Sequence, residues 1–400
     1  MFWEKKLGSW VESIRGSAAL PLRLELWNGQ QFDFGHHQPQ VTIKVPHASA
    51  AGCLLEPSLY NLGRAYVEGQ IEVEGKVSEI IAVGMELARR SLKPEGRFGR
   101  IVRAFHHTKK SDEDAIRYHY DVSNDFYAKW LDPNMVYSCA YFENGNEDLE
   151  TAQMKKIDHI LNKIQVRPGQ TLLDIGCGWG ALVLRAAQKY GAKCVGITLS
   201  QNQYELARER VRRAGLSDRV EIRIQDYRDI EGRFDRITSV GMFEHVGEKY
   251  LTEYFTRLNS LLADDGLAMN HGITTTDPQN GEAAYGGGEF IEKYVFPHGE
   301  LVHLSTVLRT MQEGGLEALD VESLRRHYAK TCGIWAENFE ANADDLKKMV
   351  DDRRFRIWRV YLAGCSYAFR QDWISLYQVV CGKAGRDADK IAWSRKYIYC

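Results

Sequence analysis

Residues 172–180, LLDIGCGWG, constrain the fold of this chain more than any other segment. An apolar strand runs here into a glycine-rich turn that opens a helix, and glycine is needed where a chain bends tightly or its backbone touches a ligand. The spacing is GxGxG, Asp174 lies two residues before the first glycine, and Trp179 stands before the last. These features favour an adenosine face over a pyrophosphate, although dinucleotide sites and ordinary tight turns share a bare GxGxG.

A regular alternation of strands and helices begins at this loop. The predicted strands are residues 171–175, 193–198, 220–225, 234–240 and 266–271. This alternation predicts an α/β domain with an open, doubly wound and mostly parallel sheet. Ligands of such sheets lie outside the carboxyl ends of the strands, so we expect the functional residues there.

The N-terminal part, residues 1–90, predicts a separate small α+β domain. Apolar residues alternate at 22–26, an Asn-Gly hairpin turn follows, and the alternation resumes at 32–34. Further strands are predicted at 41–45 and 70–74, and helices near 57–67 and 77–90.

A basic linker is predicted at residues 91–111, which leaves 112–400 for the second domain. The surrounding sequence RRSLKPEGRFGRIVRAFHHTKK combines many Lys and Arg residues with Pro and Gly. It is either a solvated hinge or a patch that attracts anionic headgroups, with apolar residues dipping into the interface. The basic, aromatic stretch 353–359 leaves a similar choice, between an acyl-chain or headgroup contact and a solvated helix face.

Composition excludes several other classes. The net charge is −2, which argues against a general nucleic-acid binder. The sequence contains no run of eighteen apolar residues, so no membrane span is predicted, and the first residues do not resemble a secretory signal. The eight cysteines form no CxxC pair, which argues against a metal site or disulfides and for a cytoplasmic protein.

Two further segments fit a nucleotide site, each with an alternative. Thr198 ends the second strand and Gln203 follows it, at the place where many folds bind ribose. Ser200 and Gln203 also form an S-x-x-Q capping box. Asp226, followed by Tyr227, ends the third strand. Its carboxylate can accept from an adenine amino group, or it is simply a surface acid.

Four segments in the same order resemble the cyclopropane-fatty-acyl-phospholipid synthase family and its mycolic acid relatives. They are YDVSNDFYAKWLDPNMVYSCAYF, LLDIGCGWG, GITLSQNQ and DRITSVGMFEHVG, and the similarity runs from about residue 112 to 380. The resemblance implies a Rossmann-like methyltransferase domain that uses S-adenosylmethionine. It also implies transfer of a methylene to the cis double bond of unsaturated phospholipid acyl chains, with peripheral association at the inner face of the cytoplasmic membrane. By the same resemblance, residues 1–90 are expected to contact the membrane or a second copy of the chain in a possible homodimer.

The family's cofactor contacts carry over to residues that match its motifs. Together with Asp174 and Trp179, the predicted contacts of S-adenosylmethionine are Tyr137, Ser138, Gly176, Gly178, Gly180, Thr198, Leu199, Ser200, Gln203, Asp226 and Tyr227.

The chemistry of the acceptor explains other residue types. An alkene is a weak nucleophile, and its attack on a sulfonium methyl leaves a carbocation-like centre. Such a site must be dry and must stabilise positive charge, for which aromatic faces are suited. The candidate rings, most of them expected in the core, are Phe126, Tyr127, Tyr137, Tyr141, Phe142, Tyr285, Tyr294, Phe296 and Tyr328.

Ring closure also needs a proton acceptor, and the resemblance implies a bound bicarbonate ion. The matching residues are Cys139, Glu244, His271, Ile273 and Tyr328, with Glu244 expected to set the orientation and basicity of the anion. The resemblance also makes Cys365 a candidate of lower rank, because a free cysteine is usually a small buried apolar group.

Each of these residues has a structural alternative. Glu244 could cap the helix that begins near Lys249, and a lone histidine such as His271 is more often a satisfied core residue. We expect His245 to be structural. The glycine-rich segment 274–290 borders the acceptor site and leaves the acceptor lipid and the product open.

Three rival functions are also compatible with the sequence. The nearest is a related enzyme that stops at a methyl- or methylene-branched chain. The others are an N- or O-methyltransferase of a soluble small molecule and a non-catalytic lipid-binding protein with a relict cofactor fold.

Overall fold

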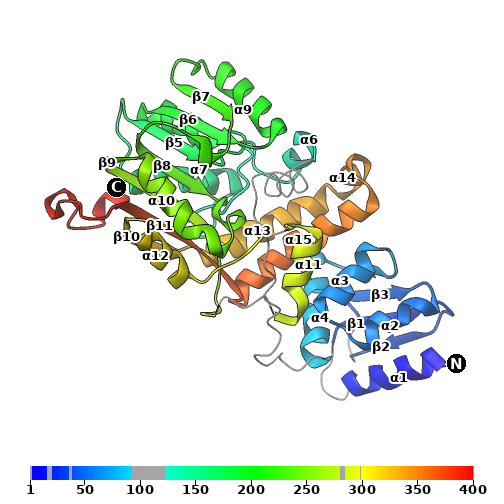
Figure 1. Cartoon of the computed structure of the whole chain (residues 1–400). Helices are drawn as coiled ribbons and strands as arrows, with labels where there is room; N and C mark the ends of the chain where they lie inside the picture. Colours follow the sequence, from blue (N-terminus) through cyan, green and yellow to red (C-terminus); the bar gives the residue numbers. More distant parts are fainter. Residues whose placement is uncertain are drawn as a thin grey trace. The chain divides into compact units, whose positions relative to one another are not determined.

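The chain forms two compact units. The computed structural model describes residues 2–15, 20–35, 38–91, 122–279, 284–297 and 299–399 (Figure 1). The first unit comprises residues 1–104, 282–297 and 335–371, and the second comprises 105–281, 298–334 and 372–400. The predicted domains 1–90 and 112–400 are continuous in sequence, whereas these units are not. The linker predicted at 91–111 lies, after its first residue, outside the described residues.

The second unit contains a sheet whose described strands follow the order β10-β11-β9-β8-β5-β6-β7. Strands β5 to β9 are parallel, and β11 and β10 extend the sheet antiparallel beyond β9. All five predicted strands are present, which confirms the mostly parallel α/β sheet. The bounds are β5 Thr171–Ile175, β6 Lys193–Thr198, β7 Val220–Ile224, β8 Phe234–Val240, β9 Leu262–Thr275, β10 Leu316–Ser323 and β11 Ile374–Lys383.

Helices cover both faces of this sheet (Figure 1). Leu172 and Leu173 are neighbours on β5 but belong to separate core clusters, because side chains alternate between faces along a strand. The Leu172 cluster includes α7, α8 and α9, and the Leu173 cluster includes α10 and α12. The helix bounds are α6 Asn124–Ala128, α7 Leu149–Lys163, α8 Ala181–Tyr190, α9 Gln201–Arg213, α10 Leu251–Leu261 and α12 Leu304–Glu313. A further helix, α13 Arg325–Ala341, belongs to the second unit up to residue 334 and to the first unit from residue 335.

The first unit is a small α+β structure, as predicted. Its described strands pair in the order β2-β1-β3-β4, with bounds β1 Leu22–Leu26, β2 Gln31–Asp33, β3 Val41–Val45 and β4 Glu72–Glu74. The predicted hairpin joins β1 to β2, and Gly29 adopts the positive φ of 81° that its turn requires. The helices are α1 Phe2–Arg15, α2 Gly52–Leu55, α3 Leu59–Val67, α4 Val77–Ser91, α11 Gly287–Tyr294, α14 Ala343–Met349 and α15 Asp352–Arg370.

Two observations bear on the expected membrane contacts. Three arginines of the basic stretch 353–359, on α15, are engaged within the first unit: Arg353 with Glu68, Arg356 with Glu72 and Arg359 with Glu340. These pairs make the stretch a structural contact of α15, which weakens its interpretation as a headgroup surface. None of the helices in the described residues combines the length and apolar character needed to cross a bilayer.

Candidate active site

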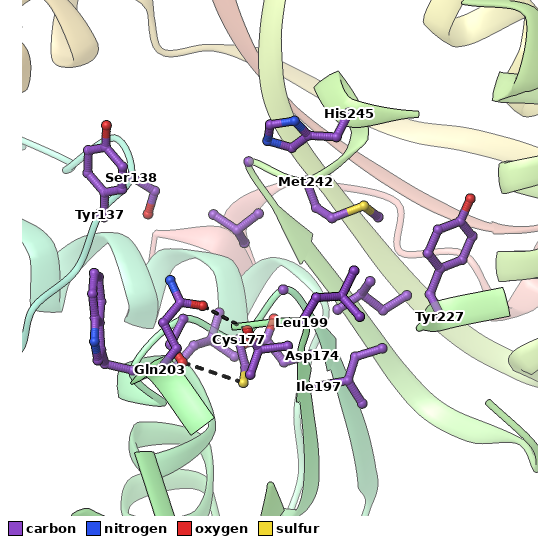
Figure 2. Close-up of a pocket in the computed structure, with 18 of the residues that line it drawn as sticks. Tyr137, Ser138, Asp174, Cys177, Ile197, Leu199, Gln203, Tyr227, Met242 and His245 are labelled. Carbon is purple, nitrogen blue, oxygen red and sulfur yellow. Dashed lines mark hydrogen bonds between the residues drawn. The ribbon is translucent and has the colours of Figure 1, made fainter. Parts of the chain in front are cut away.

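A cavity of about 280 Å³ opens at the carboxyl ends of the parallel strands, where the sequence predicted a ligand site. Eleven of the thirteen predicted cofactor residues line it: Tyr137, Ser138, Asp174, Gly176, Gly178, Trp179, Thr198, Leu199, Gln203, Asp226 and Tyr227. In Figure 2, Tyr137 and Ser138 lie across this space from Tyr227. The other two, Gly180 and Ser200, are the N-cap residues of α8 and α9, directly beside residues that line the cavity.

The glycine loop after β5 has the geometry that requires glycine. Gly176, Gly178 and Gly180 have φ angles of 79°, 53° and 84°, all in the left-handed region that side chains disfavour. Gly180 also packs closely on α9, since an added Cβ would lie 3.3 Å from Cβ of Ala207. The loop therefore brings its bare backbone to the cavity and brings α8 close to α9.

The segment after β6 combines both expected roles. The Ser200 hydroxyl accepts from the backbone N–H of Gln203 at 3.4 Å, which is the capping half of the predicted box. The Gln203 side chain does not complete the box, because its Oε1 accepts from the Thr198 hydroxyl at 2.8 Å and the residue lines the cavity. Capping and a place in the site coexist here.

Asp226 is not a simple surface acid. Its side chain is 11% exposed, and its two oxygens accept from Nε and Nη2 of Arg228 at 2.9 and 2.6 Å. The neighbouring Tyr227 packs edge-on against the buried Tyr254, with ring centroids 5.4 Å apart. This end of the cavity is therefore lined by a paired carboxylate and a packed tyrosine ring.

Aromatic rings form the wall beside the glycine loop. Tyr127 is fully buried, and its ring centroid lies 5.0 Å from that of Trp179 and 5.7 Å from that of Tyr137. Trp130 meets Tyr137 edge-on at 5.4 Å. Because Tyr137 and Trp179 both line the cavity, this cluster presents aromatic surface to whatever occupies it.

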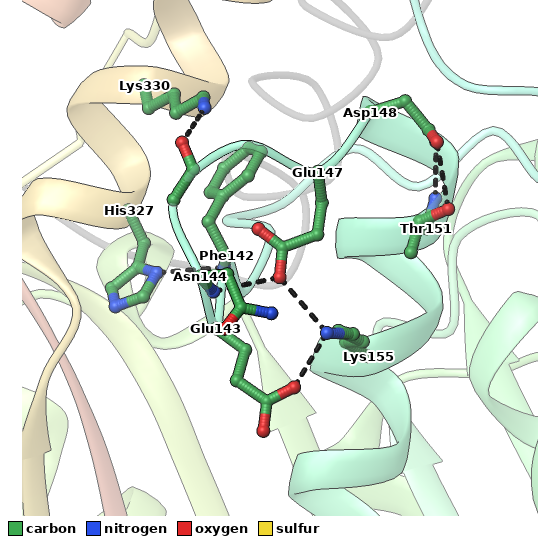
Figure 3. Close-up of polar contacts among 10 residues, drawn as sticks. Phe142, Glu143, Asn144, Glu147, Asp148, Thr151, Lys155, His327 and Lys330 are labelled. Carbon is green, nitrogen blue, oxygen red and sulfur yellow. Dashed lines mark hydrogen bonds and ion pairs between the residues drawn. The ribbon is translucent and has the colours of Figure 1, made fainter.

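The segment that carries Tyr137 to Cys139 is anchored on both sides. Figure 3 shows its continuation, in which the backbone N–H of Phe142 donates to Nδ1 of His327 at 3.0 Å. Glu147 accepts from the backbone N–H of Asn144 at 2.9 Å and from Lys155 at 3.0 Å. These contacts tie the segment to α13 and α7.

Glu244 lies next to the cavity, in a short 3-10 turn, Phe243–His245, that follows β8. Its Oε1 accepts from the backbone N–H of Ile273 at 2.7 Å, while Oε2 is buried and has no partner among the described residues. Burial raises the pKa of this carboxyl to about 7. The capping alternative is wrong, because Glu244 bonds to β9 and the next helix, α10, begins at Leu251.

His271, on β9, has a hydrogen-bond partner for only one of its two ring nitrogens among the described residues. Its Nδ1 accepts from Nε2 of Gln378 at 3.2 Å, whereas its Nε2 is buried and has no partner among the described residues. Burial and the charges of Lys156 and Lys163 hold the pKa of His271 well below its ordinary value. The ring is therefore neutral, and with Nδ1 accepting, its proton is on Nε2.

Backbone contacts connect the remaining predicted residues to this pair. Ile273 pairs with Leu376 of β11, whose carbonyl accepts from the N–H of Leu324 at 2.8 Å. The Leu324 carbonyl accepts from Tyr328 N–H at 3.0 Å and faces the Cys139 thiol at 3.8 Å. Burial raises the pKa of the Cys139 thiol far above its usual range, so it is not a thiolate.

Cys365 belongs to the first unit, on α15, whereas the cavity and Glu244 belong to the second. Burial raises the pKa of the Cys365 thiol to about 12. A thiol with this pKa is a poor nucleophile near neutral pH.

Sequence reasoning missed Lys156, Met242 and His245, all of which line the cavity. His245 was expected to be structural, yet it follows Glu244 in the turn and lies beside Met242 at the cavity in Figure 2. The position of His245 next to Glu244 could have indicated that it lies at the site. Nothing in the sequence indicated this for Lys156, because a lysine within an amphipathic helix usually lies in solvent.

The sheet order and the cavity after a GxGxG turn define an S-adenosylmethionine-dependent methyltransferase of Rossmann-like fold. Residues 107–379 match the model of the mycolic acid cyclopropane synthetase family, and 9–95 match a domain of unknown function. The chain belongs to the mycolic acid cyclopropane synthetase family and is an enzyme of that class.

Relatives and solved structures agree with this assignment. The chain is 48% identical over 386 residues to a probable fatty acid methyltransferase of Pseudomonas putida, covering 96% of this chain and 97% of that one. It is 33% identical over 359 residues to the cyclopropane-fatty-acyl-phospholipid synthase of Escherichia coli, covering 88% and 90%. A solved cyclopropane synthase from Mycobacterium tuberculosis superposes with a TM-score of 0.64 and 32% identity, covering 68% and 98%.

Proposed function

We propose that this enzyme transfers a methylene from S-adenosylmethionine to the cis double bond of unsaturated phospholipid acyl chains and closes a cyclopropane ring. One observation carries the proposal. Glu244 Oε2, an acceptor when the carboxyl is ionised, and His271 Nε2–H, a donor, are both buried without a partner among the described residues, on neighbouring segments. Unpaired buried polar atoms are costly, so such a pair fits a small polar guest.

Bicarbonate fits this pair, because it offers an oxygen that accepts and a hydroxyl that donates. Glu244, His271 and Tyr328 would hold it by their side chains, and Cys139 and Ile273 by their backbone. When bound, the ion supplies the proton acceptor that ring closure requires.

The chain's own residues would prepare the site in three ways. The neutral His271 donates without adding a positive charge beside the sulfonium. Glu244, fixed by Ile273, accepts a hydrogen bond in a buried place where such bonds are strong. Tyr137 and Trp179 present aromatic faces that favour the positive charge of the sulfonium and of the alkylated lipid.

We extend the proposal to where the enzyme is located and to its association with a second copy of the chain. We place the enzyme peripherally on the inner face of the cytoplasmic membrane, where it meets its phospholipid, and we propose a homodimer. The relative in Escherichia coli is named for a phospholipid substrate and covers nearly the whole chain, which supports this choice of lipid.

A vesicle assay tests the proposal. The enzyme is incubated with vesicles of unsaturated phospholipid and S-adenosylmethionine, and the acyl chains are analysed by mass spectrometry and NMR. We expect each product chain to gain one methylene and to show cyclopropane proton signals. Saturated vesicles are the matched control. Acyl chains that gain no mass would overturn the proposal.

A methyl- or methylene-branched product is the second candidate. It is favoured by the relative at 48% identity, which is named a probable fatty acid methyltransferase. Such an enzyme would share the cofactor residues and resolve the carbocation differently. Loss of a proton from a chain carbon leaves a methyl-branched alkene, and a hydride shift followed by loss of a proton from the new methyl leaves a methylene branch. NMR of the same product separates the two outcomes, since a branched chain lacks cyclopropane signals.

A further inference from the structure

Lys156 is a buried cation without a counter-ion in the part of the chain that the structure describes. It is 2% exposed, lies on α7 and lines the cofactor cavity. Its Nζ donates to the hydroxyl of Ser138 at 2.6 Å, its one hydrogen bond among the described residues. Lys163, on the same helix and equally buried, is instead paired with Asp320 at 3.1 Å and Glu322 at 2.5 Å.

The groups around Lys156 do not replace a direct partner. Asp174 and Asp132 act on it at a distance, and their carboxylates are engaged by the Thr238 hydroxyl and by the N–H of Val136. The other titratable groups that interact with Lys156 are Cys139 and His271. Burial lowers the pKa of Lys156 to about 8, so the group is still largely protonated at neutral pH. An ammonium has three donors, and one is used.

The position of Lys156 is fixed by its own helix. One turn earlier, Gln153 donates from Nε2 to the carbonyls of Val136 and Ser138 at 3.2 and 2.8 Å. α7 thus holds the segment that carries Tyr137 and Ser138 along one face of the cavity. The Lys156 ammonium and the Ser138 hydroxyl are presented to the cavity as a preformed pair.

We propose that Lys156 is an anion-binding residue of this site and that its ammonium, with the Ser138 hydroxyl, binds an oxyanion of the carboxylate type. A buried charge is stable when it is paired, and a carboxylate in the cavity supplies the partner. Two sources share this chemistry: the carboxylate of S-adenosylmethionine and a free carbonate species. The first rests on the cofactor class alone, and the second rests on the proposed function.

Calorimetry on the full chain distinguishes the sources. Lys156→Met keeps the apolar stem and removes the charge. If the cofactor carboxylate is the partner, the affinity for S-adenosylhomocysteine falls about 10- to 100-fold, as expected for a charge-assisted hydrogen bond. The affinity for methylthioadenosine, which lacks the amino-acid part, changes less than about twofold. Lys189→Met is the matched control, because Lys189 pairs with Asp158 at 2.9 Å, Asp158 keeps Arg185 as a partner, and Lys189 does not line the cavity.

If carbonate is the partner, both nucleoside affinities are unchanged in Lys156→Met. The rise in melting temperature that bicarbonate gives to the wild-type complex with S-adenosylhomocysteine is then lost, with nitrate as the control anion. Unchanged nucleoside affinities together with an unchanged bicarbonate effect would overturn the proposal. Neither readout uses turnover, so a failure of the vesicle assay would remove the proposed function and leave this result standing.

The wild-type chain offers a test that does not depend on the variant's folding. The affinity for S-adenosylhomocysteine is divided by that for its decarboxylated analogue, which keeps an amine that stays protonated up to pH 9 and has no carboxylate. If Lys156 binds that carboxylate, the ratio falls several-fold between pH 7 and pH 9 as the Lys156 ammonium, with a pKa of about 8, loses its proton. A flat ratio, with no bicarbonate effect on melting, would also overturn the proposal.

Discussion

Glu244 shows how much a single residue could be predicted. The sequence placed it in the turn after the strand predicted at 234–240, and His271 at the end of the strand predicted at 266–271, both at the carboxyl edge of the sheet. In the structure β9 continues to Thr275, so His271 lies within the strand. The sequence did not predict that Ile273 N–H holds one carboxylate oxygen and leaves the other buried and unpaired. That arrangement depends on a 3-10 turn folding against β9, and no periodicity in the sequence reports such a contact.

The environment of Glu244 makes a prediction about stability. Its pKa rises from 4.5 to about 7 on folding, so the stability it contributes is complete below pH 4.5 and is lost as the pH rises through 7. Glu244→Gln has no carboxyl to ionise, so its free energy of unfolding does not fall in this way as the pH rises. We expect the variant to be roughly 3 kcal/mol more stable than wild type at pH 8 and equal to it near pH 4, by urea unfolding.

Turnover by Glu244→Gln should be lost at every pH, while S-adenosylhomocysteine still binds. Glu248→Gln, which changes an exposed acid near the same turn, is the control. Equal stability of wild type and Glu244→Gln at pH 8 would show that the carboxyl is not penalised by burial.

Gly272 makes a second prediction at this scale. A Cβ there would lie 1.9 Å from Cε1 of Phe243 and 3.1 Å from Oε1 of Glu244, so the turn must shift. We expect Gly272→Ala to cost about 1–3 kcal/mol and to lower turnover at least about tenfold. Gly364→Ala, in a helix with open space around the new atom, is the matched control.

The affinity of Gly272→Ala for S-adenosylhomocysteine separates the two parts of the site. Gly272 and Phe243 do not line the cavity, so this affinity should change less than about twofold. A large loss of affinity would mean that the turn also shapes the cofactor cavity.

At the scale of elements, local pattern predicted the parallel strands and missed the antiparallel edge. β5 and β6 are largely apolar, and apolar runs indicate buried parallel strands. β8, FDRITSV, is also mostly buried although more than half of its residues are polar. β9 begins at Leu262, earlier than predicted. The prediction started later because Asp264-Asp265-Gly266 suggests a turn, whereas the structure keeps these residues in the strand with a register shift against β8. β10, LEALDVES, mixes acids with apolar residues and has no clear strand period.

The contact between α7 and β10 was equally invisible in the sequence. Lys163 pairs with Asp320 and Glu322, and Nε2 of His159 lies 2.7 Å from Oε2 of Glu322. These residues are more than 150 positions apart, so no local rule joins them. The cluster fixes the helix that also carries Lys156.

The pKa of Glu322 gives a prediction for this pair of elements. Although burial opposes it, hydrogen bonds from His159 and Lys163 lower the pKa of Glu322 from 4.5 to about 2. The resulting stability is present above pH 4.5 and is lost as the pH falls from 4.5 through 2. Glu322→Gln should therefore be roughly 3 kcal/mol less stable than wild type at pH 6, and the difference should vanish towards pH 2.

Urea unfolding across this pH range measures the effect. Glu317→Gln, an exposed acid on the same strand, should follow the wild-type curve. A difference between wild type and Glu322→Gln that stays constant with pH would contradict the assigned ion pairs.

At the scale of the whole molecule, the two units divide the chain differently from the sequence prediction. Periodicity identifies the type of each element, but not which distant segments pack together. The first unit takes in 282–297 and 335–371, and Phe290 and Ile357 from these segments share a core cluster with Val67. The cofactor cavity and Glu244 lie wholly in the second unit.

The last prediction tests whether the second unit binds the cofactor independently of the first. On α15, Arg359 donates to both oxygens of Glu340 at 2.8 and 2.9 Å and to the Tyr66 hydroxyl at 3.0 Å. Arg359→Met leaves the partly buried Glu340 unpaired, which is expected to cost about 3 kcal/mol or more within the first unit. Hydrogen exchange should therefore rise in α3 and α15, while the affinity for S-adenosylhomocysteine, measured by calorimetry, stays within about twofold of wild type.

Arg354→Met, on the same helix, is the control, because the Arg354 side chain has no hydrogen-bond or ion-pair partner among the described residues. Faster exchange in the first unit with unchanged affinity would mean that the second unit keeps the cofactor site in order by itself. A tenfold loss of affinity in Arg359→Met would show the opposite, since the variant's defect can reach the cavity only through coupling between the units. In that case the first unit would be part of the catalytic apparatus rather than a separately stable addition to it.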